Sequence, residues 1–187
     1  MLIFGGDAQA AGDLQARAAR GDLVVDGFLI PTRDLTSPKG LLSGKRGAPG
    51  LNAQIVCDLH RRPVDAGILL PGSAHDARAF RDSGLAKTYE QHLTGNGPSL
   101  IGACGYIGIV PLTPFKKLEY RELTAAELLF NRQVNRRRWV VKQGIAHLRT
   151  WKILRIGYRR PLRKADQTLQ TVLKLQMYRR HTIEALE

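Results

Sequence analysis

A single acidic residue, Asp26, interrupts the otherwise apolar run LVVDGFLI over residues 23–30. A continuous apolar run of this length predicts a strand that is buried on both faces. A buried carboxylate is costly unless it is hydrogen-bonded, paired with a cation or bound to a metal ion. Asp26 is therefore the first candidate for metal-dependent chemistry, because carboxylate oxygens are the ligands that Mg²⁺ prefers.

A second stretch has the form of a site but lacks the residues for one. The sequence GPSLIGACGY places glycines on both sides of Ala103 and Cys104, where a short strand should end. Ala103 supplies no functional group, and a cysteine is a soft ligand that suits Mg²⁺ poorly. Thiol catalysis is not favoured either, because no paired histidine accompanies Cys104.

Two further aspartates are weaker candidates. Asp76 lies beside His75 in AHDARAF, at the start of a predicted helix. The pattern Ser73-x-x-Asp76 resembles a capping box, so we favour a capping role for Asp76 over a role in a site. Asp58 ends a predicted strand and is interpreted as a turn residue, and His147 is expected to be packed or to face solvent.

Positive charge is concentrated toward the C-terminus. Residues 131–180 contain 15 of the 29 Lys and Arg residues but only one of the 16 acidic residues. Such a one-sided surface favours binding to the phosphates of a nucleic acid over a merely solvated helical face. Trp139 and Trp151 are expected in the core rather than stacked on bases. The residues expected to contact DNA are Arg132, Arg136, Arg138, Arg149, Lys152, Arg155, Lys116 and Lys117.

The scaffold for these residues is predicted as strands followed by helices, which indicates an α/β or α+β domain with a mixed sheet. Thr124 and Glu127 form a capping-box pattern at the start of the longest helix. We expect strands at 23–30, 51–59, 63–70 and 99–104, a possible edge strand at 108–114, a loop at 31–50, a turn around 94–99, and helices at 8–20, from 73, at 124–149 and at 163–180.

Five segments occur in the order and spacing of one family. They are VVDGFLIPT, SGKRGAPGLNAQIVCDLHRRPVDAG, LPGSAHDARAF, LIGACGYIGIVPLTPFKK and NRQVNRRRWVVKQGIAHLRTWKIL. Together they resemble the catalytic domain of bacterial insertion-sequence transposases of the DDE superfamily, in the branch related to harbinger transposases. The resemblance implies a ribonuclease-H-like α/β fold, in which helices flank a mixed five-stranded sheet and the C-terminal helices are basic. It also implies three carboxylates that hold two divalent ions, Mg²⁺ or Mn²⁺.

The resemblance assigns these three carboxylates to Asp26, position 103 and position 142. The second is normally the Asp of a Gly-Asp-x-Gly-Tyr element, and here that position is Ala103. The third is normally a Glu shortly before IAHL, and here it is Lys142. We therefore expect weak or lost metal binding and little or no strand cleavage. We also expect Lys142 to form an ion pair with Asp26 in place of a metal ion.

Three functions stay open from the sequence. The first is a catalytically degenerate transposase domain, and the second is a non-catalytic nucleic-acid-binding protein or regulator that reuses the fold. The third is an active metal-dependent DNA nuclease that uses Asp26, Asp76 and another acid. DNA is the expected partner, mainly through its phosphates, with a second copy or an intact transposase as protein partners.

The domain boundaries follow from the resemblance and the charge. We expect an N-terminal extension over 1–21, one domain over 22–180 and a tail over 181–187. The helix-turn-helix that such transposases usually carry has no counterpart in the extension, so recognition of element ends should be weak. Two unpaired cysteines and no apolar run of roughly 18 residues predict a location in the bacterial cytoplasm, on the nucleoid when DNA is bound, and not in a membrane.

Overall fold

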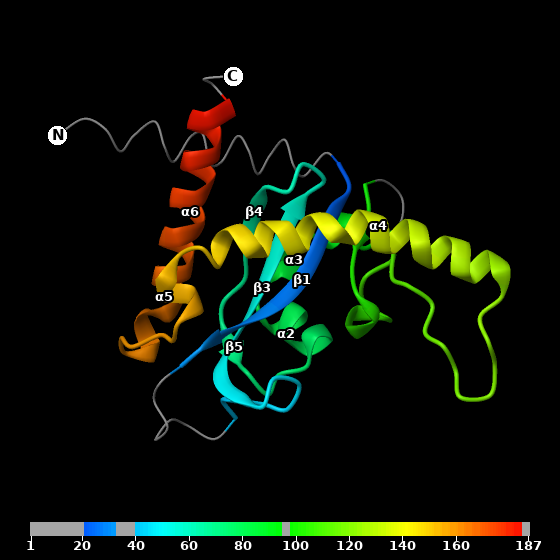
Figure 1. Ribbon diagram of the computed structural model, residues 1–187, viewed down its shortest axis with the longest axis horizontal. Coiled ribbons are helices and arrows are strands. Elements are labelled where there is room, and N and C mark those ends of the chain that lie inside the picture. Colours follow the sequence, from blue (N-terminus) through cyan, green and yellow to red (C-terminus); the bar gives the residue numbers. More distant parts are fainter. Residues whose placement is uncertain (1–20, 33–39, 95–97, 185–187) are drawn as a thin grey trace.

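The computed structural model describes residues 21–32, 40–94 and 98–184 of the chain (Figure 1). The predicted helix at 8–20 and residues 95–97 of the predicted turn lie outside the described residues. None of the side chains of the predicted tail at 181–187 is described. In chain order the elements are β1 (Leu23–Pro31), β2 (Leu42–Ser43), β3 (Ala48–Asp58), β4 (Pro63–Ala66), β5 (Leu70–Pro71), α2 (Asp76–Asp82), α3 (Leu85–Thr88), η1 (Glu90–His92), β6 (Leu100–Ile101), η2 (Cys104–Tyr106), α4 (Ala125–Leu148), α5 (Lys152–Arg155), η3 (Leu162–Lys164) and α6 (Ala165–Glu184).

The sheet is mixed, as predicted, and its strands run in the order β2-β3-β1-β6. β1 is antiparallel to β3, with Asp26 opposite Ile55, and it is parallel to the short β6. β4 and β5 both pair with β3, so the described residues form six strands rather than five. The α/β class predicted from the order of strands and helices is confirmed.

Two apolar cores lie on the two faces of this sheet. Side chains alternate between the faces of a strand, so Val24 and Phe28 pack in the core under α4, α5 and α6. Leu23 and Val25 point the other way, into the core that Phe80 of α2 and Leu85 of α3 close. The alternation also places Asp26 on the α4 side of the sheet and Gly27 on the α2 side.

The long helix α4 begins as the sequence predicts. Thr124 accepts a hydrogen bond from the Glu127 backbone N–H, and the Glu127 side chain accepts one from the Thr124 backbone N–H. The first part of α4 extends beyond the edge of the sheet, and the rest crosses it (Figure 1). The crossing is close at Gly144, where an added Cβ would lie 2.5 Å from Cys57 Sγ.

Three element predictions were wrong in part. The predicted loop at 31–50 contains β2 and the start of β3, because Leu42 and Ser43 pair with Pro49 and Ala48 in a short hairpin. The predicted strand 63–70 is divided into β4 and β5, which pair with different parts of β3. The predicted edge strand 108–114 is reduced to one isolated bridge between Leu112 and Ile101, since its prolines lack the N–H groups that a ladder needs.

Candidate functional site

Asp26 lies midway along β1, beside an open edge of the strand. β6 pairs only with Leu23 and Val24 of β1. The Leu23 N–H donates to Ser99 O at 3.0 Å, and amide directions alternate along a strand, so the Gly27 N–H points to the same side beyond the end of β6. There it donates to Asp26 Oδ1 at 3.0 Å. Asp26 thus receives its hydrogen bond from its own neighbour instead of from a partner strand.

The electrostatic environment of Asp26 is mixed. Burial raises the pKa of its carboxyl above the ordinary value of 3.8, and the negative charge of Asp76 raises it further. The Gly27 N–H and the cationic side chains of Arg138 and Lys45 act in the opposite direction. Asp26 is therefore a partly buried carboxylate with cations nearby but, among the described residues, without an ion pair.

Ala103 lies where the resemblance places the second acid. It follows β6, the strand parallel to β1, and its extended backbone precedes η2. The backbone at Gly102–Tyr106 is held by the Tyr106 side chain. Its ring would lie 3.2 Å from a Cβ added at Gly102, and its hydroxyl donates to Gln54 Oε1 at 2.6 Å. The strand end keeps its shape, and the side chain at position 103 offers no ligand.

Asp76 reaches the same edge of β1 from the other face. Cβ atoms added at Gly27 and Gly105 would lie 3.0 Å from Asp76 Oδ1 and 3.1 Å from Asp76 Oδ2. The carboxylate therefore fits between β1 and η2, in space that two glycines leave open. Asp26 and Asp76 approach the edge from opposite faces of the strand.

The predicted capping role of Asp76 was wrong. The N-cap of α2 is His75, whose Nδ1 accepts from the Ala77 N–H at 3.4 Å, and Ser73 does not cap the helix. The Asp76 carboxylate pairs instead with Lys45, with Nζ 3.4 Å from Oδ2. An imidazole immediately before the helix can replace the more distant hydroxyl, which frees Asp76 to point toward β1.

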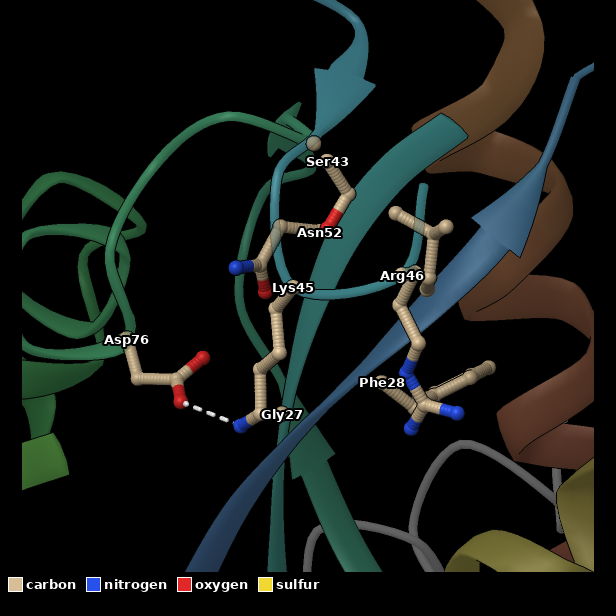
Figure 2. Close-up of a pocket in the computed structure, with 9 residues that line it drawn as sticks. Gly27, Phe28, Ser43, Lys45, Arg46, Asn52 and Asp76 are labelled. Atoms are coloured by element: carbon tan, nitrogen blue, oxygen red, sulfur yellow. Dashed lines mark hydrogen bonds and ion pairs between the residues drawn. The ribbon is translucent and has the colours of Figure 1, made fainter. Parts of the chain in front are cut away.

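Sequence reasoning missed two cationic residues of this site. Lys45 and Arg46 lie on the turn between β2 and β3, which is closed by hydrogen bonds from the Arg46 and Gly47 N–H groups to Ser43 O. With Gly27, Phe28, Asn52 and Asp76 they line a small open pocket. Figure 2 shows Lys45 extending to Asp76 and Arg46 reaching over Phe28. The segment SGKRGAPG carried the signal, since it pairs adjacent cations with glycines that favour a tight turn.

Lys142 does not pair with Asp26, contrary to the expectation. Within the described residues no ion pair joins them, and Lys142 is exposed on α4. Arg138, one turn earlier on the same side of the helix, is the α4 cation that lowers the pKa of Asp26. Its Nη1 donates to Asn135 Oδ1 at 2.9 Å, and its Nε is buried with no hydrogen-bond partner among the described residues.

A buried series of amides holds the floor of the site. The Gln54 amide accepts from Tyr106 and donates to Asn52 Oδ1 at 2.8 Å, and Asn52 donates to Ala74 O at 3.0 Å. Ala74 lies just before α2, so these bonds link β3, η2 and the helix that carries Asp76. The arrangement fixes Asp76 relative to β1 without using its carboxylate.

The described residues do not fit a two-metal site. No group of three or more His, Cys, Asp or Glu side chains among them could hold a metal ion. Mg²⁺ needs several hard, anionic oxygens, and two metals need a denser set. Here two carboxylates on opposite faces of β1 stand beside Lys45 and Arg138.

The remaining candidates take ordinary structural roles. Asp58 is the turn residue that was predicted, accepting from the backbone N–H groups of His60 and Arg62 at 2.9 Å and pairing with Arg62 Nε at 2.6 Å. Cys104 is exposed, and its Sγ lies 3.8 Å from Pro114 O. His147 is half-buried near the end of α4.

The tryptophan prediction was half right. Trp151 is partly buried and donates to Gln176 Oε1 at 3.1 Å. Trp139 is 53% exposed, with the Arg61 guanidinium 5.6 Å from its ring centroid, so it is not a core residue.

The basic residues predicted to contact DNA occupy α4 and its C-cap, α5 and the segment before α4. Their side chains are mostly exposed, and Lys117 pairs with Glu122. Half-buried members are Arg138 and Arg149, and exposed members are Arg132, Arg136, Lys152, Arg155, Lys116 and Lys117. No helix in the described ranges is both long and apolar enough to cross a membrane.

Comparison with known proteins identifies the family of the chain. Residues 25–176 match the family described as DDE superfamily endonuclease. The chain is 31% identical over 134 residues to a probable transposase for insertion sequence element IS702 from Microchaete diplosiphon, which covers 68% of this chain and 45% of the relative. It is 32% identical over 139 residues to a putative transposase for insertion sequence element IS112 from Streptomyces albus G, which covers 71% of this chain and 49% of the relative.

Each alignment covers most of this chain but less than half of the relative. The chain spans about half the length of these two curated transposases. No solved structure matches it. Because the family match extends over residues 25–176, most of the chain, the chain belongs to the DDE superfamily of endonucleases and transposases.

Proposed function

We propose that this chain is a catalytically degenerate DDE transposase domain that binds DNA through its phosphates and does not cut it. The observation that carries the proposal is the composition of the site. Asp26 keeps its place on β1, but Ala103 offers no oxygen, position 142 is cationic, and Asp76 is paired with Lys45 at 3.4 Å. Such a set repels a divalent cation instead of holding it.

We further propose that the sheet is ribonuclease-H-like. The strand order β4-β3-β1-β6, with β1 antiparallel to β3 and parallel to β6, supports this proposal. Leu112, which bridges Ile101 in parallel, extends the order on the far side of β6. In this arrangement the edge of β1 next to the end of β6 is where acids from two strands and α4 would converge.

DNA binding is supported by the surface. Residues 131–180 carry nearly all of the excess positive charge of the chain, and most of these side chains are exposed. Contacts from Lys and Arg to phosphates position a protein on a duplex without reading its sequence. A regulator that competes with, or pairs with, an intact transposase would need no more than this.

An active nuclease built on Asp26 and Asp76 is the second candidate. It is favoured by the proximity of the two acids, since the charge of Asp76 raises the pKa of Asp26. The Lys45 ion pair counts against it, and so does the lack of a third acid that could share a metal ion among the residues the structure describes. We therefore rank it below the degenerate domain.

The test combines binding and cleavage with the native chain. A labelled duplex should bind with an affinity that falls steeply as salt rises. Supercoiled plasmid should stay intact with Mg²⁺ or Mn²⁺. Metal-dependent nicking that is lost in Asp26→Ala would contradict the proposal and support the nuclease, whereas failure to bind DNA at any salt concentration would remove both.

A further inference from the structure

The degenerate site has gained cations where the resemblance implies metal ions. Two carboxylates, Asp26 and Asp76, lie at the open edge of β1. Lys45 and Arg138 both lie close enough to lower the pKa of Asp26. Each of these cations has a cationic neighbour: Arg46 lies next to Lys45 on the β2–β3 turn, and Lys142 lies four residues after Arg138 on α4. With these neighbours included, positive side chains outnumber negative ones at this edge.

The cations are held on two independent elements that face the same strand. The β2–β3 turn presents Lys45 and Arg46 from one side, and its Lys45 side chain is 80% exposed even while it contacts Asp76 (Figure 2). Helix α4 presents Arg138 from the other side. An anion seated at the edge of β1 would therefore meet cations from both directions.

Arg138 also has unused capacity for hydrogen bonding. Its Nη1 donates to Asn135, but its Nε is buried and has no partner in the part of the chain that the structure describes. A buried guanidinium donor without an acceptor is costly. Arg138 as a whole is only half-buried, and its planar guanidinium fork matches phosphate geometry.

We infer that the former metal site is a metal-independent phosphate site, in which Lys45, Arg46 and Arg138 bind one phosphodiester of DNA directly. The inference rests on the proposed function and names the ligand of that site. In an active DDE enzyme divalent ions would neutralise the bound phosphate. Here the cationic side chains neutralise the phosphate, so binding needs no metal ion.

The experiment measures binding of a short labelled DNA duplex by fluorescence anisotropy in EDTA. The test variant is Lys45→Gln/Arg46→Gln, which changes an exposed turn. The matched control is Arg81→Gln/Lys87→Gln, which removes two exposed cations from α2 and α3. Thermal melts of each variant establish that the fold is intact.

The site variant should bind about tenfold more weakly than the control at physiological salt, with a salt slope that is smaller by about one, because losing one phosphate contact removes about 0.9 from it. Mg²⁺ should not strengthen binding by the native chain. If the site variant and the control bind alike while the native chain still binds, the phosphate site is wrong and DNA binding through α4 and α5 stands. If the native chain does not bind, the proposed function fails and the inference fails with it.

A second variant gives an independent readout. Ala103→Asp/Lys142→Glu makes the edge more negative by three charges, so in EDTA it should bind the duplex about tenfold more weakly, and Mg²⁺ should restore the affinity. Equal affinity of the native chain and this variant in EDTA would show that no phosphate lies at the site, and would overturn the inference.

Discussion

Asp26 and Asp58 are two acids on neighbouring strands, and they are treated differently by the fold. Asp58, at the end of β3, is 5% exposed and accepts from two backbone N–H groups and the Arg62 guanidinium. Asp26, in the middle of β1, accepts from the N–H of its own neighbour, and burial raises its pKa. The partners of Asp58 include a cation and two turn N–H groups, whereas Asp26 has no ion pair among the described residues, as the proposed loss of a metal site would leave it.

The largest expected effect is on the structural acid. Asp58→Ala removes the carboxylate that accepts from Arg62 Nε and from the backbone N–H groups of His60 and Arg62. We expect a loss of about 2–4 kcal/mol in the free energy of unfolding, measured by urea denaturation. A loss below about 0.5 kcal/mol is typical of a surface substitution. It would mean that the partners of Asp58 do not stabilise the fold and that Asp58 is no more a structural acid than Asp26.

At Asp26, in contrast, we expect a substitution to increase the free energy of unfolding. Asp26→Asn keeps the shape of the side chain and removes a partly buried charge, so it should stabilise the native chain at neutral pH by about 1 kcal/mol. The same urea denaturation measures it. Destabilisation would show that Asp26 has a stabilising partner and is a structural acid like Asp58.

The pH dependence sharpens the same comparison. The pKa of Asp26 is raised above 3.8 in the folded protein, so the fold favours the protonated carboxyl. The stability that Asp26 contributes is therefore fully present below pH 3.8 and is lost as the pH rises through the pKa of the folded state. The advantage of Asp26→Asn over the native chain should therefore be small at the acid end and grow toward neutrality. Thermal melts of both proteins across this range measure it, and Asp65, whose pKa is also raised by burial, is common to both. An advantage that stays constant with pH would contradict this account of Asp26.

The smallest effect on stability is expected at Lys45. The Lys45 side chain is mostly exposed although it pairs with Asp76. Exposed ion pairs contribute about 0–1 kcal/mol to the free energy of unfolding. Lys45→Gln should therefore change the free energy of unfolding by less than about 0.5 kcal/mol. A larger loss would mean that the β2–β3 turn is held by this pair, and that Lys45 is part of the scaffold instead of the anion site.

Much of the fold was accessible from local patterns. The apolar run around Asp26 predicted β1, and the Thr124–Glu127 capping box fixed the start of α4 to the residue. The hairpin at Asp58 followed from two apolar runs around a short polar turn. In each case the signal lay within a few residues of the feature.

The parts that were missed depend on distant contacts. Lys45 and Arg46 became site residues because the β2–β3 turn lies beside Gly27 and Phe28 of β1. The segment SGKRGAPG indicates a turn with adjacent cations, but not the strand beside which that turn lies. The choice between Lys142 and Arg138 as the cation near Asp26 depends on how α4 crosses the sheet. His75 replaced Ser73 as the cap because its imidazole accepts from the Ala77 N–H in the first turn of α2.

The measurement that tests the central claim most directly is metal-dependent nicking of supercoiled plasmid by the native chain and by Ala103→Asp/Lys142→Glu, side by side. The account predicts that only the double variant cuts with Mg²⁺ or Mn²⁺, and that adding Asp26→Asn to it abolishes cutting. Cutting by the native chain at a rate equal to that of the double variant would contradict the account, because positions 103 and 142 would then not be the places where the second and third carboxylates were lost.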